Sequence, residues 1–324
     1  MSSRKVISII SPAFNEEGGI RRCYEEVKAV MATLADRYDY EHVFGDNCST
    51  DRTLEILRTI AAQDPRVKVV TYTRNWGAEK NSLTLFKQTS GDAVIPVLSD
   101  LQDPPEMITQ LVAAWEQGAE IVFGVYTNRA DSLPVKVLRS IYYKTVRILS
   151  DEELVDDHSG FGLYARPVVD EILKIDDFNP HIRGAIASVG FVRATVTYER
   201  RKRVAGVSSY NFGRYLDTAI NSIVSYSLVP IRLATILGLA LSGVSFLLAL
   251  GYAIVKLLNW NVQAAGATTV IVLILFFAGI QLLFLGIIGE YVAAIHGQVR
   301  RKPFAVIREK INFNRSEPEE PGIR

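Results

Sequence analysis

Four short polar segments in the first third of the chain carry residue types that bind charged ligands. They are residues 11–16 (Ser-Pro-Ala-Phe-Asn-Glu), 46–47 (Asp-Asn), 73–75 (Thr-Arg-Asn) and 99–102 (Ser-Asp-Leu-Gln). The side-chain oxygens of Asp100 and Gln102, on one side of an extended segment, suit Mg²⁺ or Mn²⁺ held against a diphosphate. A turn with a purely structural role would not need so many polar groups. These segments are therefore the first candidates for a ligand site.

Two further segments carry charge in a pattern that indicates chemistry. Residues 200–210 begin with four successive cations, and guanidinium groups donate hydrogen bonds in parallel pairs to a phosphate. Because an apolar region follows, the same cations could instead attract anionic lipid headgroups. Asp156 and Asp157 end an acidic stretch, which is typical of a solvated loop unless one of them is a functional acid.

The pattern of residues 1–228 predicts a scaffold that positions these segments. Apolar strands are expected at 5–11, 41–46, 67–73, 92–99 and 119–125, and helices at 20–34, 51–61, 79–88 and 104–117. This β-α-β alternation predicts an α/β fold with a mostly parallel sheet covered by helices. Ligands in such folds bind at the carboxyl ends of the strands, which is where the four polar segments fall.

Several function classes lose support from what the sequence lacks. It contains no G-x-G-x-x-G, no G-x-x-x-x-G-K-[ST] and no G-x-S-x-G motif, and its four histidines are scattered. Hydride transfer, ATP hydrolysis and hydrolysis by a Ser-His-Asp triad are therefore disfavoured. The formal net charge of +1 argues against a nucleic-acid partner, which would need a basic face. Two cysteines, Cys23 and Cys48, offer no disulfide framework and fit a reducing compartment.

One long stretch of the chain contains very few charged residues. Residues 229–295 contain only Arg232, Lys256 and Glu290, although the whole chain carries 36 basic and 35 acidic residues. Within it, segments 233–255 and 267–289 have no charge, and each is long enough to cross a bilayer as a helix. The short uncharged connection between them predicts a two-helix transmembrane hairpin.

The charges that flank the hairpin predict its orientation. Arg214 and Arg232 precede the first helix, and residues 300–302 (Arg-Arg-Lys) follow the second. Positive flanks stay in the cytoplasm, so the N-terminal part and the C-terminal tail are both expected there. Lys256 lies at the opposite end, where its long side chain can reach the interface. Small residues let membrane helices approach closely, and they predict a homo-oligomer: Gly238, Gly243, Gly279, Gly286 and Gly289.

Four motifs in order carry a resemblance to a known family. They are residues 11–17 (Ser-Pro-Ala-Phe-Asn-Glu-Glu), 46–51 (Asp-Asn-Cys-Ser-Thr-Asp), 74–77 (Arg-Asn-Trp-Gly) and 100–106 (Asp-Leu-Gln-Asp-Pro-Pro-Glu). The chain resembles inverting family-2 glycosyltransferases with a GT-A fold, in the branch that acts on polyprenyl phosphates and includes dolichol-phosphate mannose synthase. With two C-terminal membrane helices it is most similar to bacterial bactoprenol (undecaprenyl-phosphate) glucosyltransferases. The resemblance extends to about residue 310.

The resemblance implies a donor site. It assigns nucleotide-sugar binding to Pro12, Phe14, Glu16, Asp46, Arg74 and Asp100, and a Mg²⁺ or Mn²⁺ ion to Asp100 and Gln102. Asp46 would accept the imide N–H of uracil. The alternative is that Asp46 and Asp51 only organise the turn and cap the next helix. We assign Asp51 mainly to capping and Asp46 mainly to the ligand.

The sequence departs from the family beside the implied metal site. The usual Asp-Ala-Asp is replaced by residues 98–100 (Leu-Ser-Asp), so one carboxylate is missing. The metal is therefore expected to depend more on the phosphates of the nucleotide. Asp103 precedes Pro104-Pro105-Glu106 in the pattern of a capping box, which predicts a structural role for this acid at a helix start.

The resemblance also implies an acceptor site. Asp157 lies four residues before Phe161, the spacing of the family acid that reaches the acceptor, and with Asp100 it is the candidate catalytic residue. Arg200, Arg203, Ser208 and Tyr210 match the family residues near the acceptor phosphate. This sequence departs from the family pattern at two positions. Gly162 stands where the family has an arginine, and Ser209 stands where it has a lysine.

These observations predict a membrane enzyme that transfers a sugar from a UDP-sugar, with glucose favoured, to a polyprenyl phosphate with inversion. UDP-N-acetylglucosamine, UDP-aminoarabinose and GDP-mannose remain alternative donors, and a non-catalytic nucleotide-sugar-binding protein is a rival class. A transporter that uses Glu290 is disfavoured, because two helices per chain are few. The expected parts are a GT-A domain at 1–210, an amphipathic juxtamembrane helix at 211–228, two transmembrane helices at 229–295 and a cytoplasmic tail at 296–324. The expected location is the bacterial inner membrane.

Overall fold

The computed structural model describes residues 4–127, 158–175, 182–201, 229–258, 267–300 and 303–313 of the chain. The described residues up to 201 and from 303 onward belong to one compact unit, and the described residues from 229 to 300 belong to a second. Each unit is described by itself.

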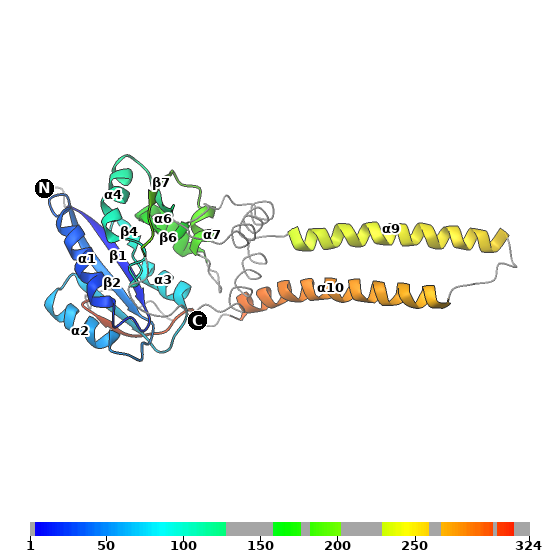
Figure 1. Ribbon diagram of the computed structural model, residues 1–324, viewed down its shortest axis with the longest axis horizontal. Coiled ribbons are helices and arrows are strands. Elements are labelled where there is room, and N and C mark those ends of the chain that lie inside the picture. Colours follow the sequence, from blue (N-terminus) through cyan, green and yellow to red (C-terminus); the bar gives the residue numbers. More distant parts are fainter. Residues whose placement is uncertain are drawn as a thin grey trace. The chain divides into compact units, whose positions relative to one another are not determined.

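An eight-stranded mixed sheet forms the centre of the first unit (Figure 1), in the order β7-β5-β6-β4-β1-β2-β3-β8. Its strands are β1 (Lys5–Ala13), β2 (Tyr38–Asp46), β3 (Val67–Tyr72), β4 (Ala93–Pro96), β5 (Ile121–Tyr126), β6 (His158–Ala165), β7 (Arg193–Tyr198) and β8 (Ile307–Ile311). The four strands β4, β1, β2 and β3 run parallel, as does the pair β5 and β7. Only β6 and β8 pair antiparallel with their neighbours. The predicted α/β fold with a mostly parallel sheet is therefore confirmed.

Helices cover both faces of this sheet. They are α1 (Ile20–Ala32), α2 (Thr53–Gln63), α3 (Ala78–Lys87), α4 (Ile108–Glu116), α6 (Arg166–Lys174) and α7 (Ile182–Ser188), with a 3-10 turn η1 (Pro105–Met107) before α4. One buried cluster joins α1, α2 and α4 to the sheet, and a second joins α3, α6 and α7. In β1, Ile9 belongs to the first cluster and Ile10 to the second, because successive side chains of a strand point to opposite faces. The core strands read as apolar runs for this reason.

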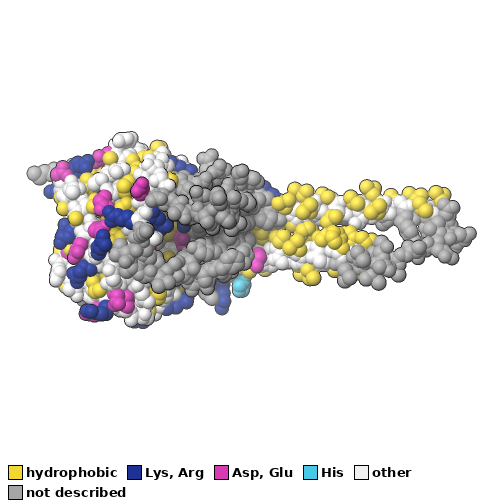
Figure 2. Space-filling view, in the orientation of Figure 1, with side chains coloured by type: hydrophobic (Ala, Val, Ile, Leu, Met, Phe, Trp, Pro, Cys, Tyr) yellow, Lys and Arg dark blue, Asp and Glu magenta, His cyan; other side chains and the backbone are white. Residues whose placement is uncertain are grey.

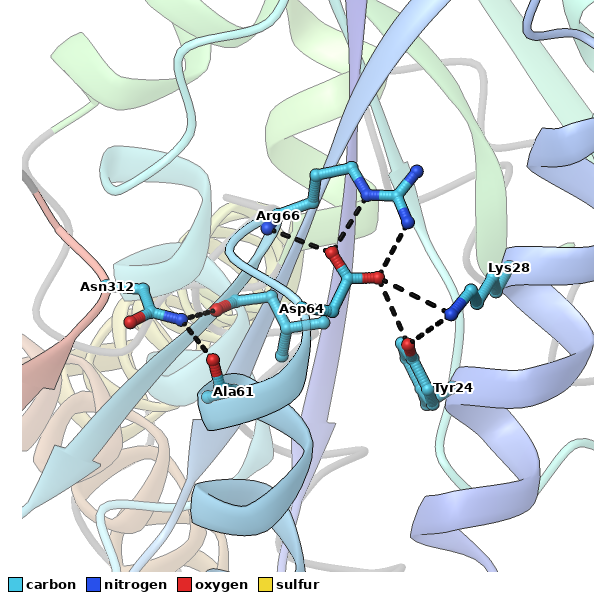
Figure 3. Close-up of polar contacts among 7 residues, drawn as sticks. Tyr24, Lys28, Ala61, Asp64, Arg66 and Asn312 are labelled. Atoms are coloured by element: carbon cyan, nitrogen blue, oxygen red, sulfur yellow. Dashed lines mark hydrogen bonds and ion pairs between the residues drawn. The ribbon is translucent and has the colours of Figure 1, made fainter.

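The C-terminal strand β8 is an element that the sequence patterns do not predict. It follows the second apolar helix in the chain and pairs antiparallel with β3. Just beyond the paired residues, the Thr73 backbone N–H donates to the Val306 carbonyl at 3.1 Å. The Asn312 side chain donates to the carbonyls of Ala61 (2.7 Å) and Val67 (2.8 Å), as Figure 3 shows. Residues on both sides of the apolar helices thus complete one sheet.

Two long apolar helices make up the described part of the second unit. They are α9 (Val229–Leu258) and α10 (Ala267–Val299), and both are long and apolar enough to cross a membrane. The most apolar windows, Ile231–Leu248 and Phe276–Val299, have mean hydropathies of 1.9 and 1.8. Hydrophobic side chains are exposed along both helices, with other side chains and backbone between them (Figure 2). The second helix continues to Val299, past the expected end of the transmembrane helices at residue 295.

A buried carboxylate links α1 to the turn before β3 (Figure 3). Asp64 accepts hydrogen bonds from the Arg66 guanidinium at 2.9 and 2.7 Å and from the Tyr24 hydroxyl at 3.0 Å, with the Lys28 ammonium 3.8 Å away. The bonds from Arg66 lower the pKa of Asp64 from 3.8 to about 2, against the opposing effect of burial. Because the pKa is lower in the folded state, this carboxylate stabilises the fold above pH 3.8, and the contribution disappears as the pH falls towards 2.

Asp64→Asn is expected to lower the free energy of unfolding by about 2 kcal/mol at neutral pH. The readout is the thermal midpoint of the full chain in detergent, which should fall by roughly 4–8 °C. The difference from the parent protein should shrink as the pH falls from 3.8 to about 2. The control is Glu55→Gln, which removes an exposed ion pair with Arg52 and should change the midpoint little. A pH-independent difference would show that the charge of Asp64 contributes nothing.

Candidate active site

The loops after β1 and β2 are braced against each other at the carboxyl edge of the sheet. The Asn15 side chain accepts the Thr50 N–H at 2.8 Å, and its own backbone N–H donates to the Ser49 hydroxyl at 3.0 Å. Asn15 adopts a φ of 55°, a left-handed conformation in which asparagine is enriched. This brace holds Phe14, which is 42% exposed, and the half-buried Glu16 at the edge.

Asp46 ends β2 and lies beneath this brace. It is 1% exposed, and both of its carboxylate oxygens lie 3.4 Å from the Ser49 backbone nitrogen, which is long for a hydrogen bond. Burial raises the pKa of Asp46. Asp51, by contrast, accepts the backbone N–H and the hydroxyl of Thr53, at 3.0 and 2.6 Å, where α2 starts. Asp51 thus organises the turn before α2, but it does not cap the helix as predicted, because Arg52 is the N-cap and no side chain caps it. Asp46 is contacted within the turn by Ser49.

The loop after β3 is held in place by Asn47, a role that the sequence patterns do not predict. Its carbonyl oxygen accepts the Trp76 N–H at 2.9 Å, and its amide donates to Asn75 Oδ1 at 3.0 Å and to the Gly77 carbonyl at 3.2 Å. The guanidinium carbon of Arg74 lies 3.8 Å from the centre of the Trp76 ring, in a cation–π contact. The exposed Arg74 is thereby held at the same edge as Asp46.

The loop after β4 forms a tight turn, so the expectation of an extended segment there is wrong. The strand ends at Pro96, and Leu101 adopts a φ of 53° and donates its N–H to the Leu98 carbonyl at 3.1 Å. The Asp100 carboxylate accepts the Gln102 backbone N–H at 3.2 Å. The turn thus brings these two predicted metal ligands together by folding the chain. The apolar core anchors it, because the Leu101 side chain is fully buried.

Two contacts show that the turn after β4 meets the loop after β1. The Ser99 hydroxyl donates to the Pro12 carbonyl at 3.1 Å. The Cys23 thiol of α1 lies close enough to Asp100 and Glu16 for both carboxylates to raise its pKa, although burial is the main cause of its rise to about 12. A Cβ placed on Gly19 would lie 3.1 Å from the Ser99 carbonyl and 3.9 Å from Glu16 Oε2, so Glu16 and the turn that carries Asp100 are neighbours.

Asp100 and Gln102 offer suitable ligand atoms for a hard divalent cation, but they supply only part of the ligands that such an ion needs. Carboxylate and amide oxygens are suitable ligands for Mg²⁺ or Mn²⁺. Among the described residues, no group of three or more His, Cys, Asp or Glu side chains could hold a metal ion. Leu98 stands where the family has a further acid. An ion bound here would take its remaining ligands from water and from a ligand's phosphates.

Asp103 does not cap the helix start, so its predicted role is wrong. Pro104 is the N-cap of η1 and no side chain caps that turn. Asp103 is instead fully buried and accepts a 2.5 Å hydrogen bond from the Tyr198 hydroxyl at the end of β7. Its Oδ1 also lies 3.5 Å from Nε of Arg200 in an ion pair. The reason is a tertiary contact: the Asp103 carboxylate binds Tyr198, nearly a hundred residues away in the sequence, instead of the backbone at the start of η1.

Arg201 fastens the same segment to the turn after β4. Its backbone N–H donates to the Gln102 carbonyl at 2.8 Å. Its guanidinium donates to Glu26 of α1 at 3.1 Å and to Glu106 of η1 at 2.7 Å. Two of the four successive cations, Arg200 and Arg201, are therefore engaged within the first unit. The sequence allowed two roles for this basic segment, binding a phosphate or attracting lipid headgroups. Contacts within the first unit are a third role, and they account for part of the segment.

His158 begins β6 directly after Asp157 and has a structural role. Its Nδ1 contacts the Gly124 carbonyl at 3.1 Å and its Nε2 lies 3.2 Å from the Tyr164 hydroxyl. Burial lowers the pKa of His158 to about 4, so the ring is neutral at pH 7 and donates from Nδ1. Further along β6, a Cβ on Gly162 would lie 2.4 Å from the Val122 carbonyl. The pairing with β5 therefore excludes the arginine that the family has there.

Several predicted residues lie outside the described part of the chain. They are Asp157, Arg203, Ser208 and Tyr210, together with the predicted juxtamembrane helix at 211–228 and the tail after residue 313. The described loops bring together Pro12, Phe14, Glu16, Asp46, Asp100 and Gln102, and Arg200 is joined to them through Asp103.

The mixed sheet, its helical layers and the ligand loops at its carboxyl edge define a GT-A-like domain joined to two apolar helices. The family model "Glycosyl transferase family 2" matches residues 8–173, and the chain belongs to that family. The SfII prophage-derived bactoprenol glucosyl transferase of Shigella flexneri is 33% identical, over 95% of this chain and 99% of its own. An uncharacterized glycosyltransferase of Bacillus subtilis (strain 168), YkcC, is 33% identical over 95% of each chain.

Among solved structures, the chain is similar to glucosyl-3-phosphoglycerate synthase from Mycobacterium tuberculosis in complex with Mn²⁺, UDP-glucose and phosphoglyceric acid. The identity is 25%, the TM-score is 0.46, and the match covers 68% of this chain and 79% of the other.

Proposed function

We propose that this protein transfers glucose from UDP-glucose to a membrane polyprenyl phosphate, with inversion at the anomeric carbon. The observation that carries the proposal is the convergence of Asp46, Asp100 and the Arg200 segment at one edge of the sheet, in a chain with two apolar helices. Relatives named bactoprenol glucosyl transferases, about a third identical over nearly the full chain, support both substrates.

The proposed donor site places the base and the diphosphate on different loops. Asp46 accepts the imide N–H of uracil, with Pro12, Phe14 and Glu16 lining the nucleotide and Arg74 beside it. Asp100 and Gln102 would hold Mg²⁺ or Mn²⁺, and such an ion would supply positive charge against the departing diphosphate. Since this chain supplies a single carboxylate in the turn, the diphosphate would provide further ligands.

The proposed chemistry needs little proton transfer. A phosphate oxygen of the lipid attacks the anomeric carbon, and the bond from that carbon to UDP breaks as UDP leaves. A phosphate monoester is largely dianionic at neutral pH, since its second pKa is about 6. We assign to Asp157 the orientation of this nucleophile and the removal of any remaining proton. Arg200, Arg203, Ser208 and Tyr210 bind the acceptor phosphate, so that alignment of two held substrates supplies much of the rate.

The strand order supports the proposed topology. Because β8 lies in the same sheet as β1 to β7, the chain must cross a membrane an even number of times between residues 201 and 303. We propose that α9 and α10 are those two crossings, with domain boundaries near residues 210, 228 and 295. Positive flanks then place the GT-A domain and both termini in the cytoplasm of a bacterium, at its inner membrane. Protease protection of either terminus in inside-out vesicles would contradict this topology.

We also propose a homo-oligomer in the membrane. A Cβ built on Gly243, Gly251, Gly279, Gly286 or Gly289 meets no atom within 4 Å, so the described protomer does not fill the space beside these glycines. Small residues allow helices to approach each other closely. Light scattering in mild detergent at several protein concentrations would contradict the proposal if it showed only monomers.

The test of the proposed function is transfer of radiolabel from UDP-glucose to undecaprenyl phosphate by the purified protein in detergent. UDP-N-acetylglucosamine, UDP-aminoarabinose and GDP-mannose are compared in parallel. The expected result is a labelled lipid formed fastest from UDP-glucose, and faster transfer from another donor would replace glucose by that sugar.

The second candidate function is a membrane-anchored protein that binds nucleotide sugars without turnover. Leu98, in place of a family carboxylate, is the observation that favours it. Tight UDP binding with no labelled lipid from any of the four donors would establish this alternative and overturn transfer.

A further inference from the structure

A buried carboxylate outside the proposed ligand set lies between the two substrate sites. Asp103 follows the turn that carries Asp100 and Gln102, and it is 0% exposed. Charges are seldom fully buried unless they are paired. Here the Tyr198 hydroxyl donates to the carboxylate, and the Arg200 guanidinium pairs with it.

The Asp103 carboxylate contacts Arg200 at the Nε atom of its side chain. Its Nε atom is buried and lies 3.5 Å from Asp103 Oδ1, while 30% of the side chain remains exposed. The guanidinium carbon also lies 5.4 Å from the centre of the Tyr126 ring. The cation is therefore fixed by a carboxylate and an aromatic ring and keeps exposed surface for a further partner.

Aromatic rings from three neighbouring strands pack together beside Asp103. The Tyr198 ring packs edge-on against Phe161 of β6 at 5.5 Å and against Tyr126 of β5 at 6.3 Å. These contacts orient the Tyr198 hydroxyl towards Asp103. Such a group of fixed rings restricts the positions that the carboxylate and the guanidinium can adopt.

We propose that Asp103 is a positioning residue that sets the guanidinium of Arg200 for the acceptor phosphate. The inference rests on the proposed function, because it takes Arg200 as a ligand of that phosphate. Since Asp103 lies one residue after Gln102, the same short segment fixes the donor's metal turn and the acceptor's arginine. The distance between the two substrates is thus set by a few covalent bonds.

The experiment is a double-mutant cycle on the full chain in detergent, with Asp103→Asn, Arg200→Ala and the double variant. Asparagine keeps the shape and can still accept the Tyr198 hydrogen, but it removes the charge that faces Arg200. The readouts are kcat, the apparent KM for undecaprenyl phosphate, UDP affinity by calorimetry and the thermal midpoint. Asp64→Asn is the matched control, because it makes the same change in another buried, arginine-paired carboxylate.

Arg200→Ala is expected to lower kcat/KM for the acceptor by roughly ten- to a hundredfold, since it removes hydrogen bonds to a charged group. Asp103→Asn should lower it by about tenfold, through the acceptor KM and with UDP affinity unchanged, because the neutral amide removes the ion pair that holds the Arg200 guanidinium. In the Arg200→Ala background, Asp103→Asn should have no further effect on the acceptor. Asp64→Asn should lower the thermal midpoint without changing the acceptor KM.

Tyr198→Phe gives a second measurement, since it removes the hydroxyl donor and leaves both charges in place. A smaller rise in the acceptor KM, in the same direction, is expected. If Asp103→Asn and Tyr198→Phe change only the thermal midpoint, or if the effects of Asp103→Asn and Arg200→Ala add, the positioning role is overturned while the acceptor site stands. If Arg200→Ala leaves the acceptor KM unchanged, the proposed acceptor site fails as well, and the two failures are distinguishable.

Discussion

Asp100→Asn is expected to abolish most of the transfer, with kcat/KM falling by at least about a hundredfold, because metal stabilisation of a leaving diphosphate contributes several kcal/mol. The structure explains why one substitution should have so large an effect. The turn after β4 offers one carboxylate and one amide, and the described residues contain no cluster that could replace them. The amide of an asparagine is neutral and would hold a divalent cation weakly.

Chelation gives an independent measurement of the same site. EDTA should abolish activity in the parent protein, and excess Mg²⁺ or Mn²⁺ should restore it. Asp92→Asn is the control, since Asp92 lies at the opposite end of β4, where its carboxylate accepts the Val6 N–H at 2.7 Å. Full transfer in EDTA would contradict the metal site.

Asp46→Ala is expected to weaken UDP binding by roughly ten- to a hundredfold while leaving the acceptor KM unchanged. Its carboxylate is buried at the end of β2, where Ser49 of the turn contacts it and the Ser49 backbone nitrogen lies 3.4 Å from both carboxylate oxygens. Since burial raises the pKa of Asp46, UDP affinity should also fall as the pH is lowered towards that pKa, because the protonated acid is a weaker acceptor.

The control for this variant is its neighbour Asp51, whose carboxylate is used at the start of α2. Asp51→Asn should affect the thermal midpoint and leave UDP affinity close to that of the parent. Calorimetry with UDP alone measures both variants without transfer. Loss of UDP binding in Asp51→Asn but not in Asp46→Ala would reverse the assignment of the two acids.

The parallel part of the fold was predictable because local pattern and final environment agree. Strands β1, β3 and β4 are largely buried and mostly apolar, and a helix follows each of them along the chain. Strand β2 (Tyr38–Asp46) contains Asp39, Glu41 and His42, and the pattern predicts only its second part, from residue 41. Strand β8 has no such signal, since its five residues, Ile307–Ile311, include three charged ones and form an edge of the sheet. Its pairing with β3 depends on a partner that is distant in sequence, and no local pattern encodes that partner.

In the candidate site, too, the sequence predicts some residues and not others. The polar ends of the parallel strands identify Asp46 and Asp100, because strand ends of one sheet must share an edge. Asp103 was misread, since a capping box describes only local hydrogen bonds and takes no account of Tyr198 and Arg200. The sequence does not predict the role of Asn47, because a single amide beside an acid has no distinctive spacing. In the structure Asn47 fixes the loop that carries Arg74 and Trp76.

The place of β8 in the sheet has a consequence for biosynthesis. Arg58 and its ion-pair partner Glu309 are 251 positions apart, so the ribosome needs roughly 12–50 seconds to reach the second after making the first. Throughout that time β3 is the open edge of a nascent sheet, with unpaired backbone groups that another chain could join. The edge closes only after both apolar helices have been synthesised. Completion of the GT-A domain is therefore a late step that follows translation of the membrane segment.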